Sequence, residues 1–410
     1  MPSLAIDFGT SNTAAAVLDA GQPLIIPLEP AQDTLPTAVF FAVQPKAMLI
    51  GQAAVDALTD GREGRFLRAL KSVLGTPLAH EMRTLGGQRL TLIEVIARFL
   101  AEVKARAERH CDQRFDAVLS GRPVHFHTRD PARDAQALAD LTECYQRAGF
   151  AEVRFMPEPE AAALAAARTA GPDAGVGLVV DIGGGTSDFT VFRGRQVLAS
   201  HGIRLGGTDL DRMLSLIHVM PLLGKNTELR AVFGPQTHTA PVAIYHDLAT
   251  WATIPFVYTP QTRRDVALMV RQAVEPVRFA RLLQVLDMEL GHDIAFAVEH
   301  GKIAGNRATG GIIDLRCIGP GLPVPLDRHR LAADLAAVAT QITAAASQTC
   351  AMAGQTPDTI TRVVLVGGSS LMDVIEQALR ATCRAARFEQ ANVFTAVVDG
   401  LALATAEATG

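Results

Sequence analysis

Two short glycine-rich segments contain the residue types that hold phosphate groups. Residues 7–12 have the sequence DFGTSN, and residues 181–188 have the sequence DIGGGTSD. Apolar residues flank each segment at strand-like spacing, which predicts strand, tight turn, strand, with glycine where the backbone takes positive φ or approaches a ligand. Two such turns facing each other would offer backbone N–H groups and two carboxylates to one polyphosphate. The pattern therefore predicts a site for ATP with magnesium.

Other glycine-loop folds explain these segments less well. A P-loop needs Gly-x-x-x-x-Gly-Lys-Ser/Thr leading into a helix, and the chain has no such string. A dinucleotide-binding turn opens a helix, whereas residues 183–185 lead into an alternating, strand-like segment. A hairpin without a ligand is the alternative for either copy alone, and the repetition with Asp at the same place weighs against it.

The composition excludes several classes of protein. A chain of 410 residues exceeds what one hydrophobic core usually holds, so we expect at least two lobes. The net charge of −4 gives no basic field for nucleic acid or an anionic membrane. Five scattered cysteines form no CxxC pair, so we expect neither a zinc site nor a disulfide framework. The early first strand leaves no room for a signal peptide, and no apolar run could span a bilayer, so we expect a cytoplasmic protein.

The elements that would position the two turns alternate along the chain. Apolar spacing predicts a β-β-β-α-β-α lobe that occurs twice, with one insertion in each copy. Strands are expected at 4–6, 13–18, 22–27, 117–121, 153–156, 177–181, 189–193, 196–201 and 362–366. Helices are expected at 91–109, 133–148, 159–169, 210–217, 331–353, 371–381 and 398–408.

These elements suggest two lobes. Lobe I would cover residues 1–176, with an inserted subdomain at about 34–113. Lobe II would cover 177–410, with an insertion at about 215–328 and a C-terminal helix, 398–408, that returns to lobe I. The stretch 219–258 shows no clear period, and its Trp251 is expected to pack within the insertion.

Taken in order, the motifs resemble the nucleotide-binding domain of the heat shock protein 70 family, within the actin-like ATPase superfamily. The resemblance covers residues 1 to about 403. The matching segments are 7–12, 66–71 (FLRALK), 158–163 (EPEAAA), 181–188, 205–211 (LGGTDLD) and 363–370 (VVLVGGSS). Residues 121–124 (GRPV) and 219–225 (VMPLLGK) resemble the YegD-like bacterial branch in particular. The resemblance implies an α/β, ribonuclease H-like fold with two lobes, each built on a mixed five-stranded sheet flanked by helices.

The resemblance also implies a role for each matching residue. Asp7 and Asp181 would hold magnesium through its water shell. Lys71, Glu158 and Asp188 would be catalytic, with Lys71 placing its charge beside the γ-phosphate and the attacking water. The nucleotide-binding residues would be Gly9, Thr10, Ser11, Asn12, Gly183, Gly184, Gly185, Thr186, Gly206, Gly207, Glu299, Lys302, Gly367, Gly368 and Ser369.

Structural roles compete with some of these assignments. A lone lysine such as Lys71 is usually solvated surface, and Glu158 before Pro159 also suits the first turn of a helix. Asp209 and Asp211 are expected to cap the helix that includes Leu210 rather than to bind nucleotide.

The chain departs from the family at three positions near the expected adenosine. Ile303 and Leu371 replace arginines, and Phe394 replaces an aspartate. Each change gives up cation–π or charge contributions of about 0.5–2 kcal/mol, so adenine affinity and selectivity should fall.

Three functions are compatible with these residues. The first is a magnesium-dependent ATPase that acts as a chaperone-like nucleotide switch, without its own linker and peptide-binding domain. Its partners would be nucleotide and a protein client or co-chaperone, with no nucleic acid and no membrane. The second is a nucleotide-binding scaffold with negligible turnover. The third is an actin-like filament former or a small-molecule kinase.

Overall fold

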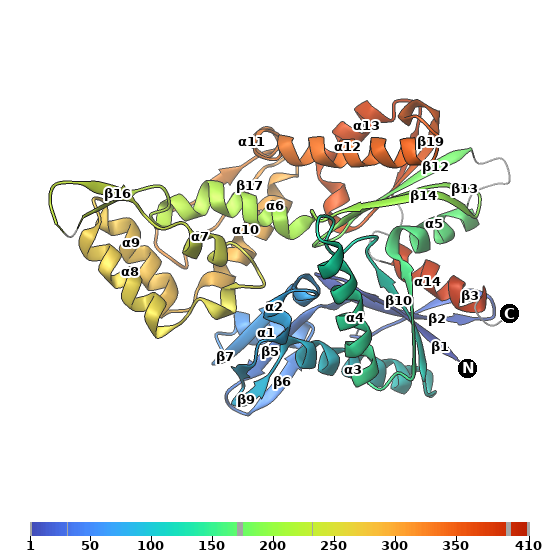
Figure 1. Ribbon diagram of the computed structural model, residues 1–410, viewed down its shortest axis with the longest axis horizontal. Coiled ribbons are helices and arrows are strands. Elements are labelled where there is room, and N and C mark those ends of the chain that lie inside the picture. The colour runs from blue at the N-terminus through green and yellow to red at the C-terminus, as the bar shows by residue number, and fades with distance from the viewer. Residues whose placement is uncertain (1, 31, 170–174, 232, 391–394, 408–410) are drawn as a thin grey trace. The chain divides into compact units, whose positions relative to one another are not determined.

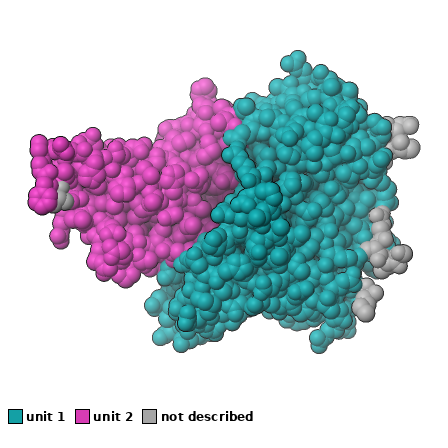
Figure 2. Space-filling model, in the orientation of Figure 1, with its two compact units in different colours: residues 1–207, 340–371, 375–410 teal, residues 208–339, 372–374 magenta. Residues whose placement is uncertain are grey.

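The computed structural model describes the chain except residues 1, 31, 170–174, 232, 391–394 and 408–410. The chain divides into two compact units (Figure 2). Unit 1 comprises residues 1–207, 340–371 and 375–410, and unit 2 comprises 208–339 and 372–374. This division is by compactness, and the lobe and insertion boundaries expected from the sequence stay predictions.

Unit 1 contains two large sheets with the same strand order (Figure 1). The first has the order β11 (Glu152–Pro157), β10 (Ala117–Arg122), β1 (Ser3–Phe8), β2 (Asn12–Asp19), β3 (Gln22–Ile26), with β4 (Leu35–Pro36) paired to β2. Read from the equivalent edge, the second has the order β20 (Arg387–Gln390), β19 (Ile360–Val366), β12 (Val176–Ile182), β13 (Ser187–Arg193), β14 (Gln196–Ile203). In the first sheet, β1 pairs antiparallel with β2 and parallel with β10. In the second sheet, β12 likewise pairs antiparallel with β13 and parallel with β19. This repeat of a mixed sheet with flanking helices agrees with the expected fold class.

Four of the long helices of unit 1 accompany the sheets, and three of these four come from the first half of the chain. They are α3 (Leu92–Cys111), α4 (Pro131–Arg147) and α5 (Glu158–Thr169), and α5 contacts strands of both sheets. The fourth, α14 (Ala396–Glu407), packs against α5 and against β1, β2 and β3. Helices α5 and α14 approach each other so closely that a Cβ atom at Gly400 of α14 would overlap the backbone of Ala161 of α5. Residue 408 of the expected C-terminal helix lies outside the described residues.

The remaining elements of unit 1 are short. They are β5 (Ala38–Ala42), β6 (Ala47–Ile50), α1 (Gln52–Thr59), β7 (Gly64–Arg68), the 3₁₀ turn η1 (Leu70–Val73), α2 (Pro77–His80), β8 (Arg83–Leu85), β9 (Gln88–Leu90), the 3₁₀ turn η6 (Gly368–Leu371) and most of α13 (Asp373–Thr382). The helix expected at 371–381 begins only at Asp373, and its first expected residue, Leu371, ends η6.

Unit 2 consists mainly of helices and two short hairpins. Its elements are α6 (Gly207–Leu214), β15 (Glu228–Arg230), β16 (Thr237–Thr239), α7 (Ala243–Leu248), α8 (Pro260–Gln272), α9 (Pro276–Asp287), α10 (Gly291–Gly305), β17 (Gly311–Ile313), β18 (Val324–Leu326) and α11 (Arg328–Asp334). Trp251 is 2% exposed and packs edge-on against Phe296 at 5.0 Å, which confirms the expected packing within the insertion.

The prediction of one helix over 331–353 is wrong. The segment forms α11 (Arg328–Asp334) and α12 (Ala336–Met352), which are separated at Leu335. Leu335 has φ −104° and ψ 8°, outside the helical region, and its side chain is completely buried. Leu335 N–H still donates to Leu331 O at 3.0 Å, and Ala339 N–H donates to Leu335 O at 3.0 Å, so the irregularity is confined to one residue while the apolar spacing continues across it.

Candidate functional site

The two glycine turns of unit 1 have the same local structure. Gly9 N–H donates to Asn12 O at 3.0 Å in the turn between β1 and β2. Gly183 N–H donates to Thr186 O, also at 3.0 Å, in the turn between β12 and β13. Each hydrogen bond closes a turn from a glycine to the third residue after it. The repeated sequence pattern thus corresponds to a repeated backbone structure.

The turns lie against each other, as the sequence predicts. A Cβ atom placed on Gly184 would lie 2.7 Å from Ser11 Oγ and 2.9 Å from Thr10 Cβ. At Gly185 it would lie 3.2 Å from Thr10 Oγ1. Glycine is therefore required here because the backbone of the second turn touches the side chains of the first.

A third glycine segment joins the same cluster. Gly207 N–H donates to Gly183 O at 2.9 Å. A Cβ atom on Gly206 would lie 2.6 Å from the backbone of Gly184 and Gly185, and one on Gly207 would overlap Ser369 Oγ. Backbone from three parts of the chain is therefore gathered at one end of the second sheet, and Ser369 extends the cluster to the end of β19.

Gly367 ends β19 beside the second aspartate. It has φ 77°, a left-handed conformation that glycine adopts without strain, and a Cβ atom there would lie 2.9 Å from Asp181 Oδ1. Gly368 follows as the first residue of η6. The predicted phosphate residues of unit 1 are thus brought together.

The predicted catalytic residues meet in the same unit. Lys71 is only 7% exposed, and its Nζ donates to Glu158 Oε1. Lys71 lies in η1, which follows Ala69 in a left-handed conformation, and Glu158 is the first residue of α5. The interpretation of Lys71 as solvated surface is therefore wrong. The position of Glu158 in the first helical turn is also observed, so its two interpretations are compatible.

Asp188 completes a buried cluster of acidic residues. It is 1% exposed, and its Oδ1 accepts a hydrogen bond from Val124 N–H at 2.7 Å. Burial, together with the charge of Glu158, raises the pKa of Asp188 and that of Asp7 to about 7. The pKa of Asp181 is also raised, by burial first and then by the neighbouring carboxylates.

The same carboxylates also raise the pKa of Lys71. Burial alone would lower the pKa of its ammonium group, but the carboxylates of Glu158, Asp7 and Asp188 outweigh burial, and the pKa is raised. Lys71 therefore stays positively charged. One buried cation faces several carboxyl groups whose pKa values are raised, first by burial and then by the charges of their neighbours.

The segment that follows Lys71 is anchored by residues that the sequence did not single out. Asp140 Oδ2 accepts from Gly75 N–H at 2.8 Å, and His127 Nε2 lies 2.8 Å from Leu74 O. Arg204 Nη2 donates to Ser72 O at 3.2 Å.

No local pattern indicated these anchors. Asp140 lies within a helix that looks ordinarily amphipathic, and Arg204 lies outside the quoted motifs. Only the fold brings them to residues 72–75.

Unit 2 holds the residues expected near adenosine. Glu299 and Lys302 lie one turn apart in α10. Lys302 Nζ forms a buried ion pair with Asp211 at 2.7 Å, and Trp251 Nε1 donates to Asp211 Oδ2 at 3.3 Å. The expectation that Asp211 caps α6 is therefore wrong, because its carboxylate faces α10.

The three departures from the family differ in their surroundings. Ile303 is 49% exposed on α10, and Leu371 ends η6. Phe394 lies outside the described residues.

The described residues contain no group of three or more His, Cys, Asp or Glu side chains placed to ligate a metal ion directly. Nor, among them, does any helix have the length and apolar character needed to cross a membrane.

The repeated sheet order and the paired phosphate turns define the actin-like ATPase fold. The family described as Hsp70 protein matches residues 3–229, which is more than half of the chain. The chain therefore belongs to the Hsp70 protein family.

Two curated relatives are similar to the chain. It is 33% identical over 222 residues to the chaperone protein DnaK of Methanothermobacter thermautotrophicus, covering 52% of this chain and 35% of that protein. It is 30% identical over 226 residues to the chaperone protein DnaK of Endomicrobium trichonymphae, covering 52% of this chain and 34% of that protein. These alignments span about a third of each relative. The YegD-like branch stays a prediction.

Proposed function

We propose that this chain binds ATP with magnesium and hydrolyses it slowly, as a nucleotide switch. The observation that supports this most is the buried Lys71–Glu158 pair, which stands with Asp7, Asp181 and Asp188 in the unit that contains the paired phosphate turns. Four carboxyl groups lie near one ammonium, and those of Asp181 and Asp188 are buried. A purely structural role does not account for them, because burying charge without compensation is costly.

The turns would hold the phosphates. Backbone N–H groups of Gly184, Gly185 and Thr186, with the hydroxyls of Thr10 and Ser11, are donors that suit phosphate oxygens. Thr10 and Ser11 are the side chains that the backbone of Gly184 and Gly185 contacts most closely.

The acidic residues fit a divalent cation. Burial raises the pKa values of Asp7, Asp181 and Asp188, and the charge of Glu158 adds to this rise. A cation bound beside them would favour their ionised forms. Magnesium prefers oxygen ligands and keeps several of its waters, so Asp7 and Asp181 would hold it through its water shell. A bound magnesium ion would neutralise charge on the phosphate oxygens.

Lys71, Glu158 and Asp188 would act on the water. Lys71 stays charged and would stabilise negative charge that develops on the transferred phosphoryl group. Glu158 holds the Lys71 ammonium in place. Asp188, fixed by Val124 N–H, would accept a hydrogen bond from the water and orient it.

A specific observation favours a second candidate, a nucleotide-binding scaffold without useful turnover. Lys302 is buried against Asp211, and Ile303 offers an exposed aliphatic side chain where the family has arginine. Both features would lower the affinity for the adenosine part of the nucleotide. The two candidates share the phosphate site and differ in turnover.

An activity that belongs to the full-length relatives is, for this chain, a separate proposal. The relatives are named chaperones, and the chain aligns with about a third of each. We propose that a protein client or co-chaperone recognises the nucleotide state of this chain.

Calorimetric titration with ATP and ADP, with and without magnesium, followed by phosphate release on the same sample, tests both candidates. Magnesium-dependent binding with slow turnover supports the switch, and binding without turnover supports the scaffold. Asp181→Ala should abolish magnesium-dependent binding without unfolding the chain, whereas Asp358→Ala, at an exposed aspartate, should change nothing. Normal binding by Asp181→Ala would contradict the two-turn site.

Lys71→Ala separates binding from hydrolysis. The variant should retain ATP binding and lose turnover by about 100-fold or more, as expected when a charge that acts on the transition state is removed. Unchanged turnover would leave Lys71 with a structural role only.

A further inference from the structure

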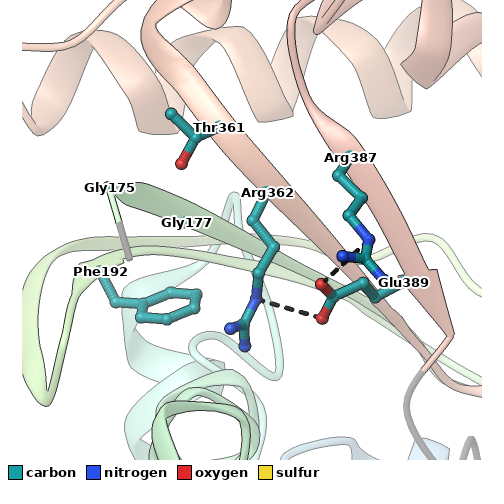
Figure 3. A pocket seen from close by; sticks show the side chains of 7 residues that line it. All are labelled: Gly175, Gly177, Phe192, Thr361, Arg362, Arg387 and Glu389. Atoms are coloured by element: carbon teal, nitrogen blue, oxygen red, sulfur yellow. Dashed lines mark ion pairs between the residues drawn. The ribbon is translucent and has the colours of Figure 1, made fainter. Parts of the chain in front are cut away.

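A cavity of unit 1 lies at the opposite end of the second sheet from the phosphate turns. Its volume is about 170 Å³, and it is lined by residues at the beginnings of β12, β19 and β20 together with Phe192 of β13 (Figure 3). The phosphate turn follows the other end of β12, six residues after Gly177. At about 3.3 Å per residue, the two sites are about 20 Å apart.

The lining residues form one row across four strands. In register, Phe192 pairs with Gly177, Gly177 with Arg362, and Arg362 with Arg387. The row therefore consists of an aromatic ring, a position without a side chain, and two arginines side by side. Glu389 lies two residues after Arg387 and thus on the same face of β20.

The lack of a side chain at Gly177 admits the Phe192 ring into this row. A Cβ atom on Gly177 would overlap the Phe192 ring, and one on Gly175 would lie 2.7 Å from Thr361 Oγ1. Phe192 is only 4% exposed, so the ring forms the floor of the cavity. The Phe192 ring itself covers Gly177, so a flat apolar group would lie against the part of the ring that faces the cavity.

The charges in the row are poorly compensated. Like charges directly opposite each other on neighbouring strands destabilise a sheet, and Arg362 and Arg387 are such a pair. They share the single carboxylate of Glu389, at 3.4 Å from Arg362 Nε and 3.7 Å from Arg387 Nε.

Arg362 is held in place by other contacts. Its Nη2 donates to Ala166 O at 2.9 Å, and its guanidinium lies 5.6 Å from the centre of the Phe192 ring. Its Nε is buried and, among the described residues, has no hydrogen-bond partner, although Glu389 Oε2 lies 3.4 Å away. The two arginines and the one glutamate give the cavity a net charge of +1.

We propose that this cavity binds a small, flat monocarboxylate whose ring lies on Phe192 and whose carboxylate accepts hydrogen bonds from Arg362 and Arg387. The volume is sufficient, since an apolar cavity of about 150 Å³ holds a benzene molecule. Planar guanidinium groups suit a planar carboxylate. Glu389 disfavours a dianion such as phosphate, because it leaves only one net positive charge.

Benzoate is the probe, and its binding to the whole chain is measured by calorimetry and by saturation-transfer NMR. We expect saturable binding in the millimolar range, with benzyl alcohol and inorganic phosphate binding more weakly. Arg387 is 83% exposed, so Arg387→Gln should leave the fold intact and weaken benzoate by about tenfold, the loss expected for one charge-assisted hydrogen bond. Glu389→Gln should tighten benzoate, because it removes a competing carboxylate.

Arg380→Gln is the matched control. Arg380 is another arginine of unit 1 that stacks on a phenylalanine, 4.3 Å from the Phe388 ring, and pairs with a glutamate, but it does not line the cavity. It should leave benzoate binding unchanged. The proposal is overturned if benzoate does not bind saturably, if Arg387→Gln and Arg380→Gln have equal effects, or if benzyl alcohol binds as well as benzoate. None of these outcomes depends on whether the chain binds ATP.

Discussion

At the scale of single residues, the two phosphate turns are alike in hydrogen bonding and differ in the room around their first glycine. A Cβ atom on Gly9 would overlap Asn12 O, the atom that accepts the hydrogen bond closing the turn. A Cβ atom on Gly183 would meet Thr186 O at 3.7 Å, an ordinary contact. Two positions that look equivalent in the sequence therefore tolerate change differently.

We expect Gly9→Ala to lower the free energy of unfolding by about 1–3 kcal/mol, because the backbone must shift to admit the methyl group. Gly183→Ala should change it by less than about 0.5 kcal/mol. Urea denaturation of the two variants measures the difference, and each variant is the control for the other. Equal costs would contradict the observed geometry.

The pKa of Asp188 gives a pH dependence with a definite sign. A carboxyl group with a pKa of about 7 when folded, and an ordinary pKa when unfolded, binds more protons in the folded chain between those values. The free energy of unfolding should therefore fall as the pH rises from about 4 to about 7, and this contribution should be constant above that.

Asp188→Asn should reduce this fall, since an amide does not titrate and its oxygen can still accept from Val124 N–H. Denaturation of magnesium-free protein at several pH values between about 4 and about 8 measures the effect. An identical pH profile for the variant and the parent would show that Asp188 does not titrate in this range.

At the scale of elements, Lys71 depends on a segment held from outside its own neighbourhood. Arg204 links three places, because it donates through Nη2 to Ser72 O, lies 3.5 Å from His127 Nδ1, and donates through its backbone N–H to Thr128 Oγ1 at 2.9 Å. Arg204 also immediately precedes the glycine segment 205–207. It therefore ties the Lys71 segment to the phosphate turns.

Arg204→Gln should lower turnover by about tenfold while changing ATP affinity little, because a small misplacement of a charge affects the transition state most. Faster hydrogen exchange at residues 72–76 should accompany the loss. Arg129→Gln, at an exposed arginine in the adjacent loop, is the control. Lower turnover with unchanged exchange at 72–76 would mean that Arg204 acts on the site in another way.

The elements were predicted well where sequence period and packing agree. The strands around both turns and the helix that became α3 lie within a few residues of their expected ranges, and Thr91 caps α3 through Glu94 N–H. The break at Leu335 was missed because neither glycine nor proline marks it. In the region 34–113, the short strands β5 to β9 were not predicted, since runs of three to five residues give little periodicity.

The site was predicted to a similar degree. The phosphate and acidic residues of unit 1 could be found because glycine, aspartate and threonine in fixed order leave few structural alternatives. The pairing of Lys302 with Asp211 could not be found, since the two residues are far apart in the sequence and each has a plausible local role. Long-range partners such as Arg204 and Asp140 become visible only after folding.

At the scale of the whole molecule, the proposed phosphate and magnesium residues all belong to unit 1. A ligand that binds only the folded state stabilises it by about 2.7 kcal/mol at a hundred times its Kd. Magnesium–ATP should therefore raise the unfolding temperature of unit 1 in scanning calorimetry. Asp181→Ala should show no such rise. Tight binding by the parent without any rise would be inconsistent with a site built from folded unit 1.

Trp251 gives the chain an internal optical probe. It is the only tryptophan and is 2% exposed. Its indole N–H donates a hydrogen bond to the carboxylate of Asp211, which also forms an ion pair with Lys302. Intrinsic fluorescence excited at the indole band therefore comes from one known place in unit 2. A change in the Asp211–Lys302 pair would alter the polarity around that indole and shift its emission, so events at α10 can be followed in the unlabelled protein on a stopped-flow timescale.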